Sequence, residues 1–107
     1  MALIVTFRVV DEEYRVLLTD REDIDIAVLL LEGQPAPSIP NGRVVRDRTG
    51  VNEGWSWSID PDSLEFADVT IEVCDGLPSH VEEGILTGDR YCPWSAEVIA
   101  LEPARRN

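Results

Sequence analysis

The chain of 107 residues carries 21 acidic and nine basic residues, for a formal net charge of −12, and 44% of its residues are hydrophobic. This composition predicts one folded domain over residues 1–107, and the negative charge disfavours binding to nucleic acid or to an anionic membrane surface. No apolar run reaches the roughly 18 residues that span a bilayer, and no basic segment precedes the apolar N-terminus, so we expect a cytoplasmic protein.

All nine basic residues are arginine. Arginine without lysine suits a GC-rich genome. Together with the acidic excess, it also suits a protein that stays soluble in high salt, where short screening lengths weaken the repulsion between carboxylates. The composition is therefore compatible with salt adaptation, which concerns habitat and not activity.

Two apolar segments open the chain. Residues 3–10 and 14–19 are rich in β-branched and aromatic residues, which favours strands. We expect an antiparallel hairpin with a three-residue loop, in which each strand has one apolar face. These faces are formed by Val5, Phe7 and Val9 and by Tyr14, Val16 and Leu18.

Residues 20–32 have the pattern of the main helix. Thr19 and Glu22 match a capping box, and the acidic residues of the first turn favour the positive end of a helix dipole. Apolar residues follow at helical spacing until Gly33 ends the run. We expect a stripe of Ile24, Ala27, Val28 and Leu31 to cover one face of the sheet.

The middle of the chain alternates between loops and strands. Three prolines in residues 34–42 predict a surface loop, and residues 43–48 predict an edge strand whose charges guard an open edge. A second copy could pair with this edge and form a homodimer. Alternating apolar and polar residues predict strands at 55–60 and 69–74, separated by the turn Asp60-Pro61-Asp62-Ser63.

Towards the C-terminus, Pro78 is expected to open a short helix at 78–84. The last strand is expected at 95–101, followed by a frayed tail. The predicted order is β-β-α-β-β-β-α-β. It describes an α+β fold with a mainly antiparallel sheet and one long helix packed on one face.

The stretch 54–66, GWSWSIDPDSLEF, carries two tryptophans at strand spacing. Trp55 and Trp57 could stack a sugar or a base, or they could fill the core as the largest apolar side chains. We favour the core, because the helix at 20–32 needs a large apolar surface beneath it. The same interpretation applies to Trp94.

Four acidic residues follow within the same region. The opening Asp-Pro-Asp is typical of a calcium loop, but the glycine at the sixth position and the glutamate at the twelfth that define an EF-hand are absent. A calcium site of another kind remains an alternative to a capped turn on an acidic surface. Its candidate ligands are Asp60, Asp62, Glu65 and Asp68.

Cys74 and Cys92 are the only cysteines, and His80 is the only histidine. A disulfide between the cysteines would close a loop of about 19 residues and stabilise the fold by around 3 kcal/mol. The alternatives are two buried thiols, a zinc site that includes His80, and a thiol enzyme in which His80 activates a cysteine. The lack of a second histidine and of a glycine-rich phosphate loop disfavours an enzyme, and nothing indicates a cofactor.

The segments GWSWSIDPDSLEFADVTIEVCDG, VEE and YCPWSAEVI together resemble a family of small domains of unknown function. Its members stand alone in bacteria or form an N-terminal module of larger, often secreted eukaryotic proteins. The resemblance covers residues 3–101 and implies no reaction, but it implies a bridge between the cysteines where the compartment allows one. The matching residues are Gly54, Trp55, Asp60, Pro61, Asp62, Ile71, Glu72, Cys74, Asp75, Val81, Glu82, Cys92, Pro93 and Trp94.

The resemblance also groups several acids around the cysteines. We prefer a structural role, in which these carboxylates cap turns and the short helix, and a ligand pocket is the alternative. The residues of this candidate pocket are Trp55, Trp57, Glu72, Asp75, Glu82 and Trp94. The leading hypothesis is a small non-enzymatic binding or interaction module, with a calcium-binding domain and a thiol enzyme as alternatives.

Overall fold

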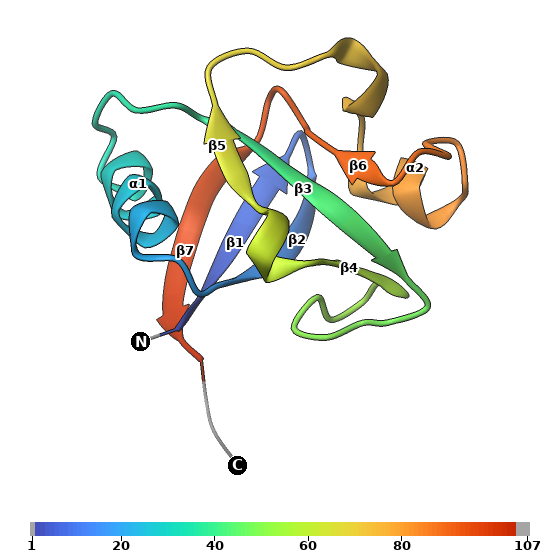
Figure 1. Ribbon diagram of the computed structural model, residues 1–107, viewed down its shortest axis with the longest axis horizontal. Helices are drawn as coiled ribbons and strands as arrows, with labels where there is room; N and C mark the ends of the chain where they lie inside the picture. Colours follow the sequence, from blue (N-terminus) through green and yellow to red (C-terminus); the bar gives the residue numbers. More distant parts are fainter. Residues whose placement is uncertain (1, 105–107) are drawn as a thin grey trace.

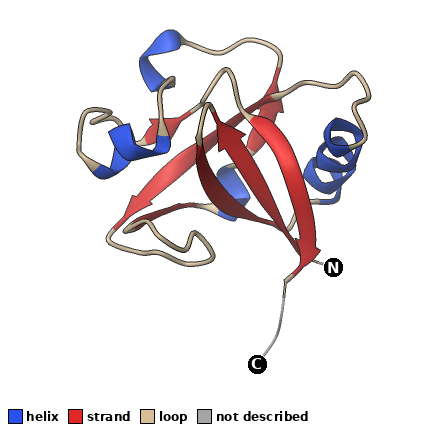
Figure 2. Cartoon of the chain, turned by 180° about the vertical axis from the view of Figure 1, so that it is seen from behind, coloured by secondary structure: helices blue, strands red, loops and turns tan. Residues whose placement is uncertain are grey.

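Two antiparallel sheets form the framework of the computed structural model, which describes residues 2–104 (Figure 1). The first sheet has the order β2-β1-β7, and it faces the viewer in Figure 2. In the second sheet, the long strand β3 pairs with three short strands. The strands are β1 (Leu3–Val9), β2 (Glu12–Leu18), β3 (Ile39–Arg46), β4 (Trp57–Ile59), β5 (Glu65–Ala67), β6 (Arg90–Tyr91) and β7 (Glu97–Pro103).

Two α-helices and two 3-10 turns complete the structure: α1 (Arg21–Leu31), α2 (Pro78–Glu82), η1 (Pro61–Ser63) and η2 (Glu72–Cys74). The α+β class and the antiparallel pairing are therefore confirmed. The predicted order differs at two places, because the third strand after the helix lies at β5 and the two-residue strand β6 was not predicted. Within residues 2–104, no helix is long and apolar enough to cross a membrane.

The N-terminal hairpin turns over two residues and not over the three that were predicted. Val9 pairs with Glu12, so only Val10 and Asp11 form the turn, and Val10 adopts a positive φ of 62°. Glu12 stays in the strand because its carboxylate accepts hydrogen bonds from Ser79 of α2. The predicted apolar faces are confirmed, since all six side chains are buried.

The core lies between the two sheets. The ring of Tyr14 in β2 lies 5.7 Å from that of Trp57 and 5.2 Å from that of Tyr91, both in the second sheet. Trp57 is 1% exposed, which confirms its predicted place in the core. The expected reason is wrong, however, because aromatic residues of the sheets surround Trp57, while α1 packs against β7, β2 and β5.

Helix α1 matches the prediction to within one residue at each end, and Gly33 follows it with a φ of 77°. The capping box is wrong, since Asp20 is the N-cap and its side chain makes no capping hydrogen bond. The apolar stripe is only partly confirmed, because Ala27 is buried while Val28 and Leu31 are exposed. The helix lies at one side of the molecule, beside β7 and β5, so a narrow line of its surface is covered (Figure 1).

The prediction of an edge strand at residues 43–48 is wrong. The strand begins at Ile39, and its backbone is paired on both sides: the Arg43 carbonyl accepts from Asp60, and the Val44 N–H donates to the Asp89 carbonyl. Strand β4 pairs with residues 44–46, so no open edge is available there. The basis for a homodimer through this segment is therefore removed, and dimerisation itself stays untested.

The predicted strand at 69–74 is also wrong. Strand β5 ends at Ala67, which pairs with Ile39, the first residue of β3. Beyond Ala67 no residue of β3 is left to pair with, so the chain leaves the sheet and continues to η2.

The C-terminal predictions are close. Helix α2 ends at Glu82, just before the expected boundary, and Gly84 follows with a φ of 77°. Strand β7 runs from Glu97 to Pro103 and so takes up the start of the predicted tail. Residues 105–107 of that tail lie outside the described part of the chain.

Candidate functional site

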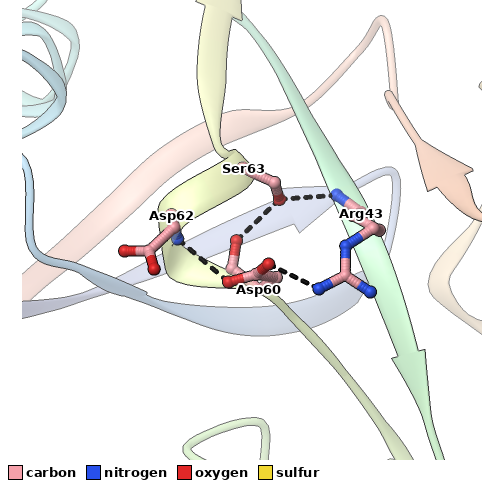
Figure 3. A network of polar contacts seen from close by, with 4 residues as sticks. All are labelled: Arg43, Asp60, Asp62 and Ser63. Carbon is pink, nitrogen blue, oxygen red and sulfur yellow. Dashed lines mark hydrogen bonds and ion pairs between the residues drawn. The ribbon is translucent and has the colours of Figure 1, made fainter.

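The Asp60 turn is a capped turn that is fastened to β3 (Figure 3). The Asp60 carboxylate lies 2.6 Å from the Arg43 guanidinium and accepts the Asp62 N–H at 3.1 Å. The Ser63 hydroxyl donates to the Asp60 carbonyl and accepts the Arg43 N–H. The hydrogen bond from Arg43 lowers the pKa of Asp60, and the turn therefore has the structural role that we preferred.

The structure does not bring the four candidate calcium ligands together. In the described chain, no three acidic, histidine or cysteine side chains are placed to hold a metal ion. Arg43 already neutralises Asp60, and Glu65 lines a hollow beside α1. The calcium alternative therefore loses its predicted ligand set, which was Asp60, Asp62, Glu65 and Asp68.

Cys74 and Cys92 form a disulfide, and both residues are buried. A bridged cysteine has no thiolate to act as a nucleophile or as a zinc ligand. His80 has a local structural role, since its Nδ1 accepts the Leu77 N–H at 3.1 Å at the start of α2. The thiol-enzyme, zinc and free-thiol alternatives are therefore wrong for this state of the chain.

The acids around the bridge bind backbone groups. Asp75 accepts the Trp94 N–H at 2.8 Å, and Glu82 accepts the N–H and the hydroxyl of Ser56 at 2.8 and 2.7 Å. The Ser56 hydrogen bonds lower the pKa of Glu82. Glu72 is exposed at the start of η2. Two of the three carboxylates thus have the structural role that we preferred.

The three tryptophans do not line a common pocket. Trp57 is buried, and the half-buried Trp55 packs against it and donates its Nε1–H to the Glu13 carbonyl at 2.8 Å. Trp94 is 37% exposed, so its predicted burial is wrong. The candidate pocket of tryptophans and acids is not assembled.

The segment of residues 68–76, here called the strap, is the most unusual surface of the molecule. It extends past the end of β5 and carries η2 (Figure 1). Its three large aliphatic residues point to solvent, with exposed fractions of 72% for Val69, 67% for Ile71 and 79% for Val73. An alternating sequence predicts one buried face, and here that face is exposed.

Several contacts hold the C-terminal end of the strap against the sheets. The disulfide joins Cys74 to Cys92, and the Cys92 N–H donates to the Cys74 carbonyl at 2.8 Å. The Tyr91 hydroxyl donates to the Gly76 carbonyl, also at 2.8 Å. The strap is therefore anchored while its apolar side chains remain uncovered.

The surroundings of the strap are acidic. Asp68, Glu72 and Asp75 are exposed between and beside the aliphatic residues. Residues 49–89 contain no lysine or arginine. The strap thus combines apolar side chains with uncompensated negative charge.

Sequence reasoning missed the strap as a candidate site. The alternation of Val69, Ile71 and Val73 with polar residues is the same in a half-buried strand. The chain offers no local signal that β3 begins too late to pair with this segment. The exposure follows from strand register, which depends on contacts distant in sequence.

The family model of the BP-74 N-terminal domain matches residues 1–105. No curated protein and no solved structure matches the chain.

Proposed function

The chain belongs to the BP-74 N-terminal domain family, and from this premise we propose that it is a non-enzymatic docking module. Its strap binds a polypeptide segment that is both basic and apolar. The single observation that carries the proposal is the exposure of Val69, Ile71 and Val73 on an anchored segment.

Single exposed apolar residues are normal on protein surfaces, whereas grouped ones mark interaction sites. Three such residues lie within five positions of the strap. Complete burial of each side chain under a partner would contribute roughly 1.5–3 kcal/mol, as an upper bound. Anchoring by the disulfide lowers the conformational entropy that binding must remove.

The charge of the strap selects the partner. The exposed carboxylates of Asp68 and Glu72 attract a cationic segment and repel an acidic one. Trp94 lies next to the strap, because its N–H is bound by Asp75, and a half-exposed tryptophan is a typical interface anchor.

A peptide titration followed by NMR tests this function. The probe is a ten-residue peptide in which arginine alternates with leucine, and its control carries glutamate in place of arginine. We expect saturable shifts confined to residues 68–76 and the Trp94 indole with the first peptide and none with the second. Ile71→Ser and Val73→Ser should each weaken binding at least fivefold.

Val10→Ser is the matched control, because Val10 is 70% exposed at the hairpin turn, far from the strap in sequence. It should leave the affinity unchanged. The proposal is overturned if neither peptide binds, if both bind equally, or if Val10→Ser weakens binding as much as Ile71→Ser.

The disulfide also bears on the compartment. Disulfides persist in oxidising environments and are rare in the cytosol. In place of the cytoplasm expected from the N-terminal residues, we infer an oxidising compartment. Alkylation of the protein from its native source, before any reduction, should label neither Cys74 nor Cys92, and labelling of both would contradict the inference.

A further inference from the structure

A hollow of about 340 Å³ lies between the first turn of α1 and the start of β5. This volume is in the range of small-molecule sites. Its walls are acidic and apolar, and they come from two elements that the tertiary fold brings together. The lining residues are Asp20, Glu22, Asp23, Ile26, Leu64, Glu65 and Phe66.

Asp23 is the unusual member of this set. It is only 6% exposed, and its charged neighbours across the hollow, Asp20, Glu22 and Glu65, are all acidic. Within residues 2–104, no hydrogen bond or arginine stabilises its carboxylate. Burial, and then repulsion from these neighbours, raises the pKa of Asp23 to about 6. A buried carboxylate without a partner is costly, so its retention calls for an explanation.

The arrangement does not suit a bare metal ion. Over the described residues, no three potential ligands are close enough to coordinate one. The apolar side chains of Ile26, Leu64 and Phe66 offer a metal nothing, but they suit the hydrocarbon part of an organic cation. Asp20 makes no capping hydrogen bond, so its charge remains unused at the helix start.

We propose that this hollow binds an alkylammonium or alkylguanidinium group, with Asp23 and Glu65 on opposite walls pairing with the cationic head. The apolar residues then pack against the alkyl stem. This site is separate from the strap and does not depend on the function proposed for it.

The test is an NMR titration of the whole chain at pH 7 with n-butylammonium and n-butylguanidinium, and with n-butanol as the neutral analogue. We expect saturable shifts in residues 20–26 and 64–66 with the cations only. Asp23→Asn and Glu65→Gln should each weaken binding, the first at least tenfold. Glu32→Gln is the matched control, since it removes one charge from the other end of α1.

Lowering the pH from 7 to 5 should weaken cation binding about tenfold, because the ionised fraction of Asp23 falls by that factor around a pKa of about 6. Capped arginine, N-acetyl-arginine-N-methylamide, distinguishes two sources of the cation. Affinity equal to that of n-butylguanidinium supports a partner's side chain as the occupant, and weaker binding supports a free small molecule.

Three results would overturn the site. In the first, n-butanol produces the same shifts as the cations, so that the hollow binds only apolar stems. In the second, Glu32→Gln weakens binding as much as Asp23→Asn, so that the attraction is general. In the third, calcium displaces the amine stoichiometrically, which would mean a metal site.

Discussion

Asn52 donates a hydrogen bond from Nδ2 to the Trp57 carbonyl at 2.9 Å, in the interior of the protein. Its Oδ1 accepts the Arg15 N–H at 2.8 Å, and the residue is fully buried. Since Arg15 belongs to β2 and Trp57 to β4, one amide group links the two sheets.

Asn52→Ala should therefore destabilise the protein by roughly 2–4 kcal/mol, because it leaves a buried N–H and a buried carbonyl without partners. Chemical denaturation measures this loss. Asn41→Ala is the control: it removes only an exposed hydrogen bond to Arg90 and should cost less than about 1 kcal/mol. Equal losses for the two variants would contradict the linking role.

Trp57 fills the core, but its Nε1 has no hydrogen-bond partner in the part of the chain described here. Trp57→Phe should change the free energy of unfolding by less than about 1 kcal/mol, since loss of the unpaired N–H offsets the smaller ring. Trp57→Ala should cost about 3–5 kcal/mol, because it leaves a large cavity. The prediction is wrong if urea denaturation gives similar losses for both variants.

The Cys74–Cys92 bridge has a sequence separation of 18 residues. In the chain-entropy model, its reduction should lower the free energy of unfolding by about 3 kcal/mol. Urea denaturation with and without dithiothreitol measures the difference. The double variant C74A/C92A should be as unstable as the reduced protein and insensitive to the reductant, and a reductant effect in that variant would point to another cause.

The pKa of Asp23 is raised to about 6 in the folded protein, above its value of near 4 in an unfolded chain. The folded state thus binds this proton more tightly. The contribution of Asp23 is fully present below pH 4 and is lost as the pH rises through 6. The groups that face it, Asp20, Glu22 and Glu65, are acidic and act in the same direction.

Asp23→Asn should therefore stabilise the protein at pH 7, by about 1–2 kcal/mol after an allowance for screening, and should have little effect at pH 4. Thermal melts of both proteins between pH 4 and 7.5 measure the difference. A constant difference across this range would show that Asp23 does not titrate in the folded state as stated.

The acidic excess predicts a response to salt. Only Arg8, Arg21 and Arg43 form ion pairs within the described chain, so many carboxylates repel each other without compensation. The melting temperature should rise with KCl, mostly below about 1 M, because the screening length falls from roughly 10 Å at 0.1 M to 3 Å at 1 M. The rise should shrink at pH 4, and full stability without salt would count against salt adaptation.

Local patterns predicted several elements correctly. The apolar faces of β1 and β2, the limits of α1 and the capped turn at Asp60 all depend on residues close together in the sequence. Period-two alternation determines which side chains share a face, and Gly33 ends a helix through its own backbone freedom. The resemblance to small domains added the bridge between Cys74 and Cys92, which spacing alone left open.

Only the tertiary structure decided whether each apolar face is covered. The strap and β1 have similar alternation, yet β1 has two neighbouring strands and the strap has none, because β3 begins at Ile39. In the same way, Asp23 is one of several acids in a helical first turn, and its burial depends on Glu65 and Leu64 from a distant segment. Alternation states which side chains point together, while burial is a property of the surface that another part of the chain presents to them.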